Sequence, residues 1–213
     1  MMKKLLIIIS LIFQQSYSQT ADDNYELYSL ILSEKLELGT TKKIDSILLI
    51  KRFENRLGND YSLFELSSDS ITSNDINILL IKTNKDTTFV KRLIQEPSIK
   101  RLITGLTDNI DDNPKIEINR LKPTNLHTQS ISTRKYYSFF GRNFDKKNPW
   151  ERIERKFGTR KVVELSRVNY SGNLAAVYYG LHCGSLCGTG NIVIFEKIDE
   201  KWRILTELNL WMS

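Results

Sequence analysis

The sequence is poor in the residues on which most catalytic and metal sites depend. It holds two histidines and two cysteines in 213 residues, which leaves little material for a hydrolytic triad or a four-ligand zinc site. It has no G-x-S-x-G elbow, no Walker loop, and no calcium loop with alternating oxygen ligands and a closing glutamate. We therefore expect no metal ion and no cofactor, and the sequence identifies no catalytic residue.

Long hydrophobic runs are missing after the first residues. The chain opens with Lys3 and Lys4, an apolar core from Leu5 to Phe13, and small residues at Ser16 and Ser18, which is the order found in signal peptides. As a helix this core would span about 13 Å, far less than a hydrocarbon layer of roughly 30 Å. We expect residues 1–18 to be a cleaved signal peptide, no transmembrane segment after cleavage, and export to the periplasm or the extracellular space.

Charge of one sign is not in large excess. The formal net charge is +6, a mild balance that permits contact with acidic surfaces, and we expect no nucleic-acid partner. Basic residues nevertheless concentrate between residues 134 and 161, interleaved with aromatic ones, and either bind an anion or form a solvated helix face beside a core-facing aromatic strand. The candidate anion-binding residues are Arg134, Lys135, Arg142, Lys146, Lys147, Arg152, Arg155 and Lys156.

The rest of the composition is that of a globular protein, with 40% hydrophobic and 26% charged residues. We expect one α+β domain over residues 19–213, with a mixed helix and strand part over 19–133 and a helix plus antiparallel sheet over 134–213. In the first part, residues 22–36 carry an apolar stripe at helical spacing, and residues 43–53 are typical of a strand.

The second part has clearer signals. Asn148 and Pro149 predict the start of a short helix that Gly158 ends. Four strand-like runs follow with short polar turns between them, which predicts an antiparallel β-meander. Period-two alternation places Trp202, Ile204, Leu208 and Leu210 on one face of the last strand. The four runs are 161–170, 174–182, 191–198 and 201–211.

The two cysteines, Cys183 and Cys187, lie where the second run must turn into the third. An exported protein leaves the reducing cytosol, so two nearby cysteines are expected to oxidise. We predict a disulfide that closes a hairpin loop and contributes about 2 kcal/mol in the chain-entropy model. Neighbouring glycines are expected to let the backbone curl. The candidate binding loop consists of His182, Gly184, Ser185, Gly188 and Gly190.

Two other interpretations of the cysteines stay open. Thiol–disulfide exchange usually uses a two-residue spacing before a helix, whereas three residues separate Cys183 from Cys187 and a strand follows. A zinc site is disfavoured because His182 and Cys183 are adjacent on an extended segment, so their side chains point to opposite faces. Such a site would also need His127 from far away in the sequence.

The last third of the chain contains four short elements, Ser166-Arg167-Val168, Ala175 to Tyr178, Cys183 to Gly188, and Lys197 to Trp202. With these elements it resembles a group of exported bacterial proteins of unknown function. The signal peptide, in which Gln19 follows Tyr17 and Ser18, resembles those of Bacteroidota. The resemblance implies export and supplies no catalytic residue.

These observations favour an exported, non-enzymatic domain that binds an envelope protein or an acidic glycan. A rigid scaffold that presents a glycine-rich loop at one end of a sheet is a common arrangement for such contacts. The alternative is a small exported enzyme, thiol-based or hydrolytic, that uses one of the cysteines or carboxylates that cannot be located from sequence.

Overall fold

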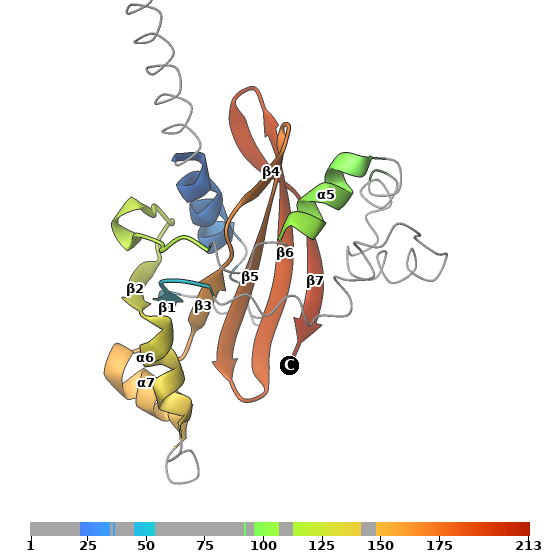
Figure 1. Cartoon of the computed structure of the whole chain (residues 1–213). Helices are drawn as coiled ribbons and strands as arrows, with labels where there is room; N and C mark the ends of the chain where they lie inside the picture. Colours follow the sequence, from blue (N-terminus) through green and yellow to red (C-terminus); the bar gives the residue numbers. More distant parts are fainter. Residues whose placement is uncertain are drawn as a thin grey trace, which may run out of the picture.

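A mixed β-sheet lies at the centre of the protein, in the strand order β2-β1-β3-β5-β6-β7, and β4 also pairs with β5 (Figure 1). A computed structural model describes residues 22–34, 36, 45–53, 92, 96–106, 113–141 and 148–213. The predicted signal peptide lies outside them. The strands are β1 (Ser46–Ile50), β2 (His127–Ile131), β3 (Val162–Leu165), β4 (Asn169–Ser171), β5 (Leu174–Gly184), β6 (Cys187–Ile198) and β7 (Lys201–Met212).

The described helical elements lie on both sides of this sheet. One helix covers residues 22–34. The others are α5 (Pro97–Gly105), η2 (Ile118–Arg120), α6 (Thr133–Tyr137), η3 (Ser138–Phe140) and α7 (Pro149–Phe157). Helices and a mixed sheet that ends in a meander make this an α+β protein, as predicted. No helix in the described ranges has the length and apolar character needed to cross a bilayer.

The antiparallel meander is confirmed over β3, β5, β6 and β7. The first strands differ from it, because β1 pairs in parallel with both β2 and β3. β2 was not predicted from the sequence. Its residues are half-buried or exposed except at Ile131, so the apolar alternation that marks a strand is weak there.

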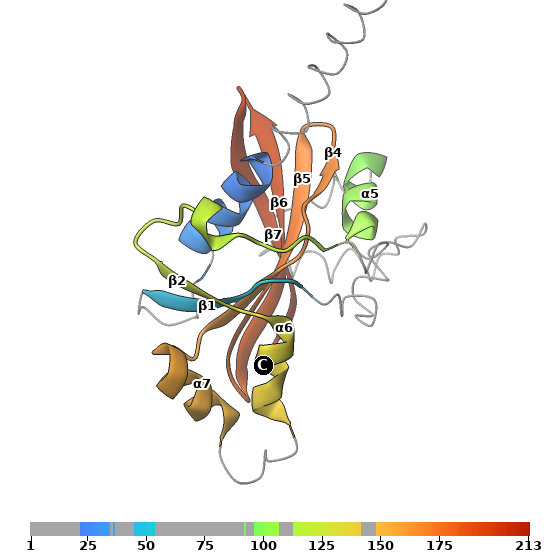
Figure 2. The same ribbon diagram turned by 60° about the vertical axis from the view of Figure 1, so that its left-hand side comes forward.

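The two faces of the sheet are buried by different helices. The helix over 22–34 places Leu27 and Ile31 against Val177 and Phe195 on one face. On the opposite face α5 packs over the upper parts of β5 and β6, and α6 with α7 packs over β1 and β3. Figure 2 shows the helix over 22–34 and α5 on opposite sides of the strands. The part of this second face between α5 and the α6–α7 pair carries the candidate site.

Ser166 explains why the predicted run 161–170 splits into β3 and β4. It is buried, its N–H donates to the carbonyl of Tyr178, and its Oγ accepts from the N–H of Tyr178 at 2.9 Å. Its own carbonyl accepts from the Tyr28 hydroxyl at 3.0 Å. A side-chain hydroxyl thus replaces one ladder bond, which lets the strand bend without leaving a buried amide unpaired.

The residues after Ser166 hold the end of α5. The Arg167 guanidinium donates to the carbonyl of Gly105 at 2.6 Å, and the Asn169 amide donates to the carbonyl of Leu102 at 2.7 Å. These side chains satisfy carbonyls that a helix leaves unpaired at its C-terminus. Gly105 lies directly against the Asn169 side chain, where a Cβ would not fit.

The predicted helix that begins at Asn148 is confirmed as α7. The Asn148 Oδ1 accepts from the N–H of Trp150 at 3.0 Å, and Gly158 ends the helix with a φ of 73°. The alternative interpretation of the segment before α7, an aromatic strand, is wrong. Residues 133–140 are helical, and Phe140 contacts Trp150 edge to face at 5.4 Å.

The alternation predicted for β7 holds for Trp202 and Ile204, which belong to the same core, and is wrong for Leu208 and Leu210. Trp202 packs in the core under the helix over 22–34, whereas Leu208 and Leu210 pack in the core under α5, on the opposite face. The cause is a register shift opposite Ile194 and Phe195, which adds one residue to β7. One extra residue reverses the face to which the following side chains point, until a second shift, opposite Gly190 and Asn191, adds another residue to β7.

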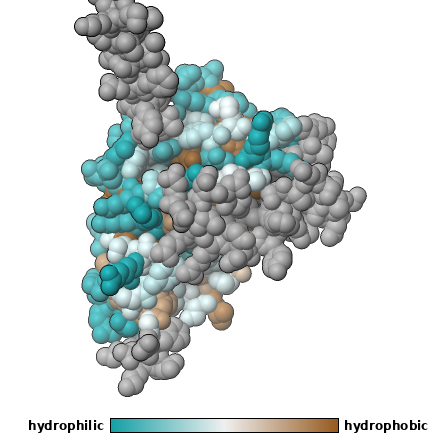
Figure 3. All heavy atoms as spheres, viewed as in Figure 1, coloured by the Kyte–Doolittle hydropathy of each residue, from teal (hydrophilic) through white to brown (hydrophobic). Residues whose placement is uncertain are grey.

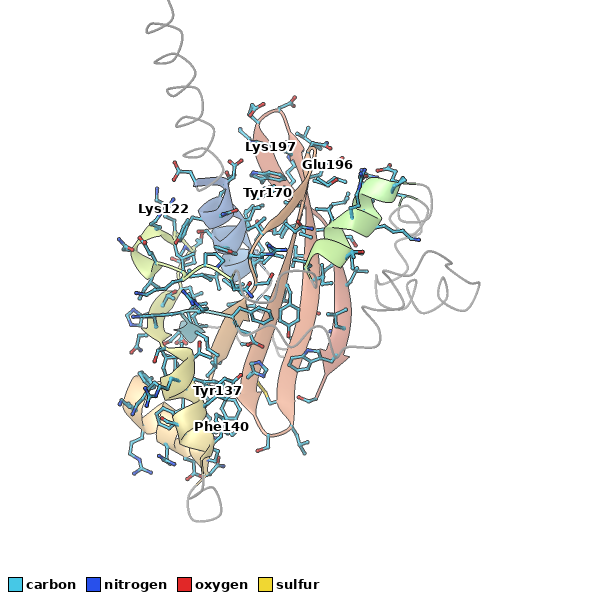
Figure 4. The ribbon with its side chains drawn as sticks, viewed as in Figure 1. Lys122, Tyr137, Phe140, Tyr170, Glu196 and Lys197 are labelled. Atoms are coloured by element: carbon cyan, nitrogen blue, oxygen red, sulfur yellow. A yellow bond between two sulfur atoms is a disulfide. The ribbon has the colours of Figure 1, made fainter. Side chains whose placement is uncertain are left out.

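Polar contacts fasten the upper end of the sheet to the helix over 22–34. Lys197, in the strand before the β6–β7 turn, donates to Asp23 at 3.2 Å and lies 5.5 Å from the centre of the Trp202 ring. The Tyr170 hydroxyl donates to Asn24 at 2.7 Å. Figure 4 shows Lys197 and Tyr170 together at this end, opposite the cysteine hairpin.

Candidate functional site

The β5–β6 hairpin carries the predicted disulfide, which joins Cys183 to Cys187 with a Cα–Cα distance of 5.1 Å. Gly184 pairs with Cys187 and His182 pairs with Gly188, so Cys183 is one extra residue on β5. This bulge places Cys183 beside its partner across the hairpin. Both cysteines of the chain are therefore bonded to each other, and a thiolate nucleophile would require this bond to be reduced first.

The loop inside the disulfide is shorter than the sequence indicated. Ser185 and Leu186 form a two-residue turn, and strand pairing begins at Cys187. None of the glycines nearby has the positive φ that only glycine adopts easily. The bulge and the tight turn, rather than glycine conformations, bring the two sulfurs together.

Trp211 explains two of these glycines. It pairs with Gly190 on β6, and its indole lies against Gly190 and Gly188. A Cβ at Gly190 would occupy the position of the indole, and one at Gly188 would approach the indole to 3.0 Å. The two glycines therefore leave a flat backbone surface on which the ring packs, a known way of covering glycine within a sheet.

His182 lies between a carboxylate and this indole. Its Nε2 is 3.1 Å from Oε1 of Glu164 on β3, and its ring stacks on Trp211 with centroids 5.4 Å apart. The two partners come from strands on either side of the β5–β6 pair. The contacts fix the His182 side chain just before the disulfide, so the base of the hairpin is tied to both neighbouring strands.

Tyr178 completes this cluster on the same face. Its hydroxyl accepts from the Trp211 indole N–H at 3.2 Å, and its ring contacts Phe53 at 5.3 Å. Gly180 lies between Tyr178 and Glu164, where a Cβ would come within 3.0 Å of the Tyr178 hydroxyl. Glu164, Tyr178, His182 and Trp211 together form the cluster that we call the hairpin brace.

The other face of the hairpin is fastened by a polar network. The Tyr179 hydroxyl donates to Glu207 at 2.6 Å, and burial, together with that carboxylate, raises the pKa of Tyr179. The Asn209 amide donates to Asn191 at 2.8 Å and to Thr189 at 2.9 Å. Side-chain hydrogen bonds on both faces of the sheet therefore join β5, β6 and β7 next to the hairpin.

Two exposed apolar side chains mark this end of the sheet. Leu186, in the turn, is 88% exposed, and Met212, at the end of β7, is 78% exposed. Met212 pairs with Thr189, and Ser213 exchanges backbone hydrogen bonds with Gly188. Figure 3 shows hydrophobic atoms at the lower end of the molecule, where the hairpin lies.

The structure separates the predicted binding loop into two parts. Gly184 and Ser185 lie at the tip of the hairpin, while His182, Gly188 and Gly190 lie in the paired strands below it. Sequence reasoning missed Glu164, Tyr178, Trp211 and Leu186. The sequence signal for Trp211 was its position near the end of a predicted strand, opposite the glycines of the preceding predicted strand.

The predicted anion-binding residues lie on two adjacent helices. Arg134 and Lys135 are on α6, and Arg152, Arg155 and Lys156 are on α7. The remaining three, Arg142, Lys146 and Lys147, fall outside the described residues. α6 and α7 lie side by side in both ribbon views (Figures 1 and 2), so the described basic residues gather from two segments of the chain.

A hollow of about 760 Å³ lies between the helix over 22–34 and residues 119–124. Side-chain hydroxyls of this helix already bind the neighbouring segment, because Ser29 and Ser33 accept from the N–H groups of Lys122 and Thr124, each at 2.9 Å. Acidic and basic side chains both line the hollow. It has no charge preference from which a ligand class can be inferred.

The described residues show no cluster of histidine, cysteine and carboxylate side chains able to hold a metal ion. Comparisons with known proteins supply no family either: no protein-family model, no curated protein and no solved structure that was searched matches the chain. Function must be inferred from the geometry of the residues themselves.

Proposed function

We propose that this chain is an exported, non-enzymatic interaction domain whose disulfide-clasped hairpin contacts a protein partner of the cell envelope. The observation that carries the proposal is an almost fully exposed leucine, Leu186, held in a two-residue turn between Cys183 and Cys187. A partner that covers this side chain removes its apolar surface from water, which favours binding.

Rigidity makes this tip suited to binding. Ordering a flexible loop costs about 0.5–1.5 kcal/mol for each immobilised side chain when a complex forms. Here the disulfide, the hairpin brace and the Tyr179–Glu207 network order the loop beforehand. Burying one leucine contributes roughly 1.5–3 kcal/mol, and a smaller ordering cost leaves more of that free energy for affinity. Met212, which pairs with Thr189 on β6, is a second exposed apolar side chain at this end of the sheet.

Export is supported by two independent features. Disulfides persist in oxidising compartments and are rare in the cytosol, and the chain has a disulfide as well as an N-terminal sequence with the order of a signal peptide. The resemblance of the last third of the chain to exported bacterial proteins is consistent with the same compartment. The proposed location is the periplasm or the extracellular space.

Acid–base catalysis is not favoured at the hairpin brace. His182 has the partner that an acid–base histidine needs, since Glu164 orients its ring. However, its Nε2 is occupied by that carboxylate and one ring face is covered by Trp211. Within the described ranges, no serine or threonine hydroxyl hydrogen-bonds to His182. The brace therefore has a positioning role for the hairpin.

The proposal is tested by a photoreactive amino acid at position 186 in cells that naturally produce the protein. We expect one covalent adduct of discrete mass, identified as the same envelope protein in repeated experiments, because the probe crosslinks only to a molecule in direct contact with it. A matched probe at Ile198 has a side chain that is 40% exposed and lies at the end of β6 that is remote from the hairpin. We expect no such adduct there. Equal labelling at both positions, or none at position 186, would contradict the proposal.

A further inference from the structure

A shallow hollow on the α6–α7 side of the protein is surrounded by cations. It has a volume of about 230 Å³ and is lined by Phe139, Arg152, Arg155 and Lys156. Arg155 and Lys156 are exposed, and Arg152 is partly so. On α7 these three basic residues are three and four positions apart, so they lie on one face of the helix. Lys135 approaches the same place from α6.

Aromatic rings hold the basic side chains at this place. The Arg152 guanidinium donates to the carbonyl of Phe139 at 3.2 Å and lies 5.4 Å from the centre of its ring. The Lys135 ammonium is 5.7 Å from the same ring, and the Lys156 ammonium is 5.6 Å from the ring of Phe157. Such contacts orient a cation without neutralising it.

Within the part of the chain that the structure describes, no carboxylate forms an ion pair with these cations. Glu154 on α7 pairs instead with Arg160, at 2.6 Å. Glu151 is one turn before Arg155 but forms no ion pair with it, and no described carboxylate pairs with Lys135, Arg155 or Lys156. Cations that lie close together on one surface repel each other, and an anion that lies between them relieves that repulsion.

We propose that Lys135, Arg152, Arg155 and Lys156 form a binding site for an acidic glycan, with Phe139 at its centre. The guanidinium groups match sulfate, phosphate or carboxylate groups with paired hydrogen bonds, and the lysines add point charges. Each exposed pair contributes little in water, so useful affinity requires several anionic groups on one chain. This site lies on α6 and α7, whereas the proposed protein partner binds the clasped hairpin. The glycan proposal and the protein-partner proposal can therefore fail independently.

The test uses the purified full chain and a fluorescent, fully sulfated heparin octasaccharide, with binding followed by anisotropy at several salt concentrations. We expect Lys135→Gln/Arg155→Gln/Lys156→Gln to lower the affinity at least about tenfold and the salt slope by roughly 3, because three counterion-releasing contacts are removed. All three side chains are exposed, so this variant is expected to keep its disulfide and its circular dichroism spectrum.

The matched control is Lys115→Gln/Lys201→Gln/Arg203→Gln, which removes the same charge from exposed positions elsewhere. It is expected to keep most of the affinity. Equal losses in the two variants would mean attraction to net charge alone and would overturn the site. So would absence of octasaccharide binding by the natural sequence, or tighter binding to phosphatidylglycerol vesicles or single-stranded DNA than to the octasaccharide. A neutral octasaccharide is expected not to bind.

Discussion

Replacing Gly190 by alanine is expected to lower the free energy of unfolding by about 1–3 kcal/mol, the usual cost of overpacking. The new Cβ would occupy the position of the Trp211 indole, which is planar and has no flexible end that can move aside. The ring would have to leave its place on β6, and with it the stack on His182 and the hydrogen bond to Tyr178. Urea unfolding followed by circular dichroism measures the change.

Gly184→Ala is the matched control for this prediction. It lies in the same hairpin, and a Cβ there would meet the Cβ of Cys187 at 3.4 Å, an ordinary contact. Alanine within a strand is normally preferred to glycine by roughly 0.5–1 kcal/mol. We therefore expect Gly184→Ala to leave stability unchanged or raise it slightly. If the two variants behaved alike, Trp211 would not be packed on Gly190.

Removal of the disulfide is expected to lower the free energy of unfolding by about 2 kcal/mol. The bond links residues four positions apart, so it closes a short loop, and in the chain-entropy model it restricts the unfolded chain by a correspondingly small amount. Cys183→Ser/Cys187→Ser is expected to fold, because the sheet cores and the hairpin brace do not depend on the sulfurs. Comparison of urea midpoints for the variant and the natural sequence gives the value.

The control for the disulfide prediction is reductant. It should lower the midpoint of the natural sequence toward that of the double-serine variant and leave the variant itself unchanged. Coincident midpoints for the natural sequence with and without reductant would show that the bond does not contribute to stability.

Sequence reasoning succeeded where the signal is local. Asn148, Pro149 and Gly158 mark the ends of α7 because capping depends on residues next to each other. The short polar turns between apolar runs predicted the meander for the same reason. The disulfide required only two nearby cysteines and an expected oxidising compartment, and the structure confirms it.

Sequence reasoning failed where tertiary packing or an extra residue in a strand determines the position of a side chain or strand. Strict alternation predicts Trp202 and Leu208 on one face, whereas a bulge in β7 puts them on opposite faces. β2 was missed because a short, half-exposed edge strand has no apolar pattern of its own. Its position is set by pairing with β1, which is distant in the sequence.

The hairpin brace could not be found from the sequence because its members come from three strands. Glu164, His182 and Trp211 are brought together only by the register of β3, β5, β6 and β7. The sequence predicts that the glycines give the backbone conformational freedom, whereas in the structure Gly190 leaves room for the Trp211 indole. In this hairpin the glycine-rich stretch encodes a packing surface.

Several residues on which the predicted resemblance depends have structural roles in this fold. Ser166 and Arg167 bend the strand and hold the end of α5, and Lys197 fastens β6 to the helix over 22–34.

We infer that the hairpin tip is ordered before any partner binds. Backbone ¹⁵N relaxation of the oxidised protein tests it directly at Gly184, Ser185 and Leu186. We predict order parameters near those of the sheet, about 0.85, because the tip is fixed by the disulfide and by the brace beneath it. Values below about 0.6 at these three residues, with the sheet remaining rigid, would show a flexible loop and contradict the account.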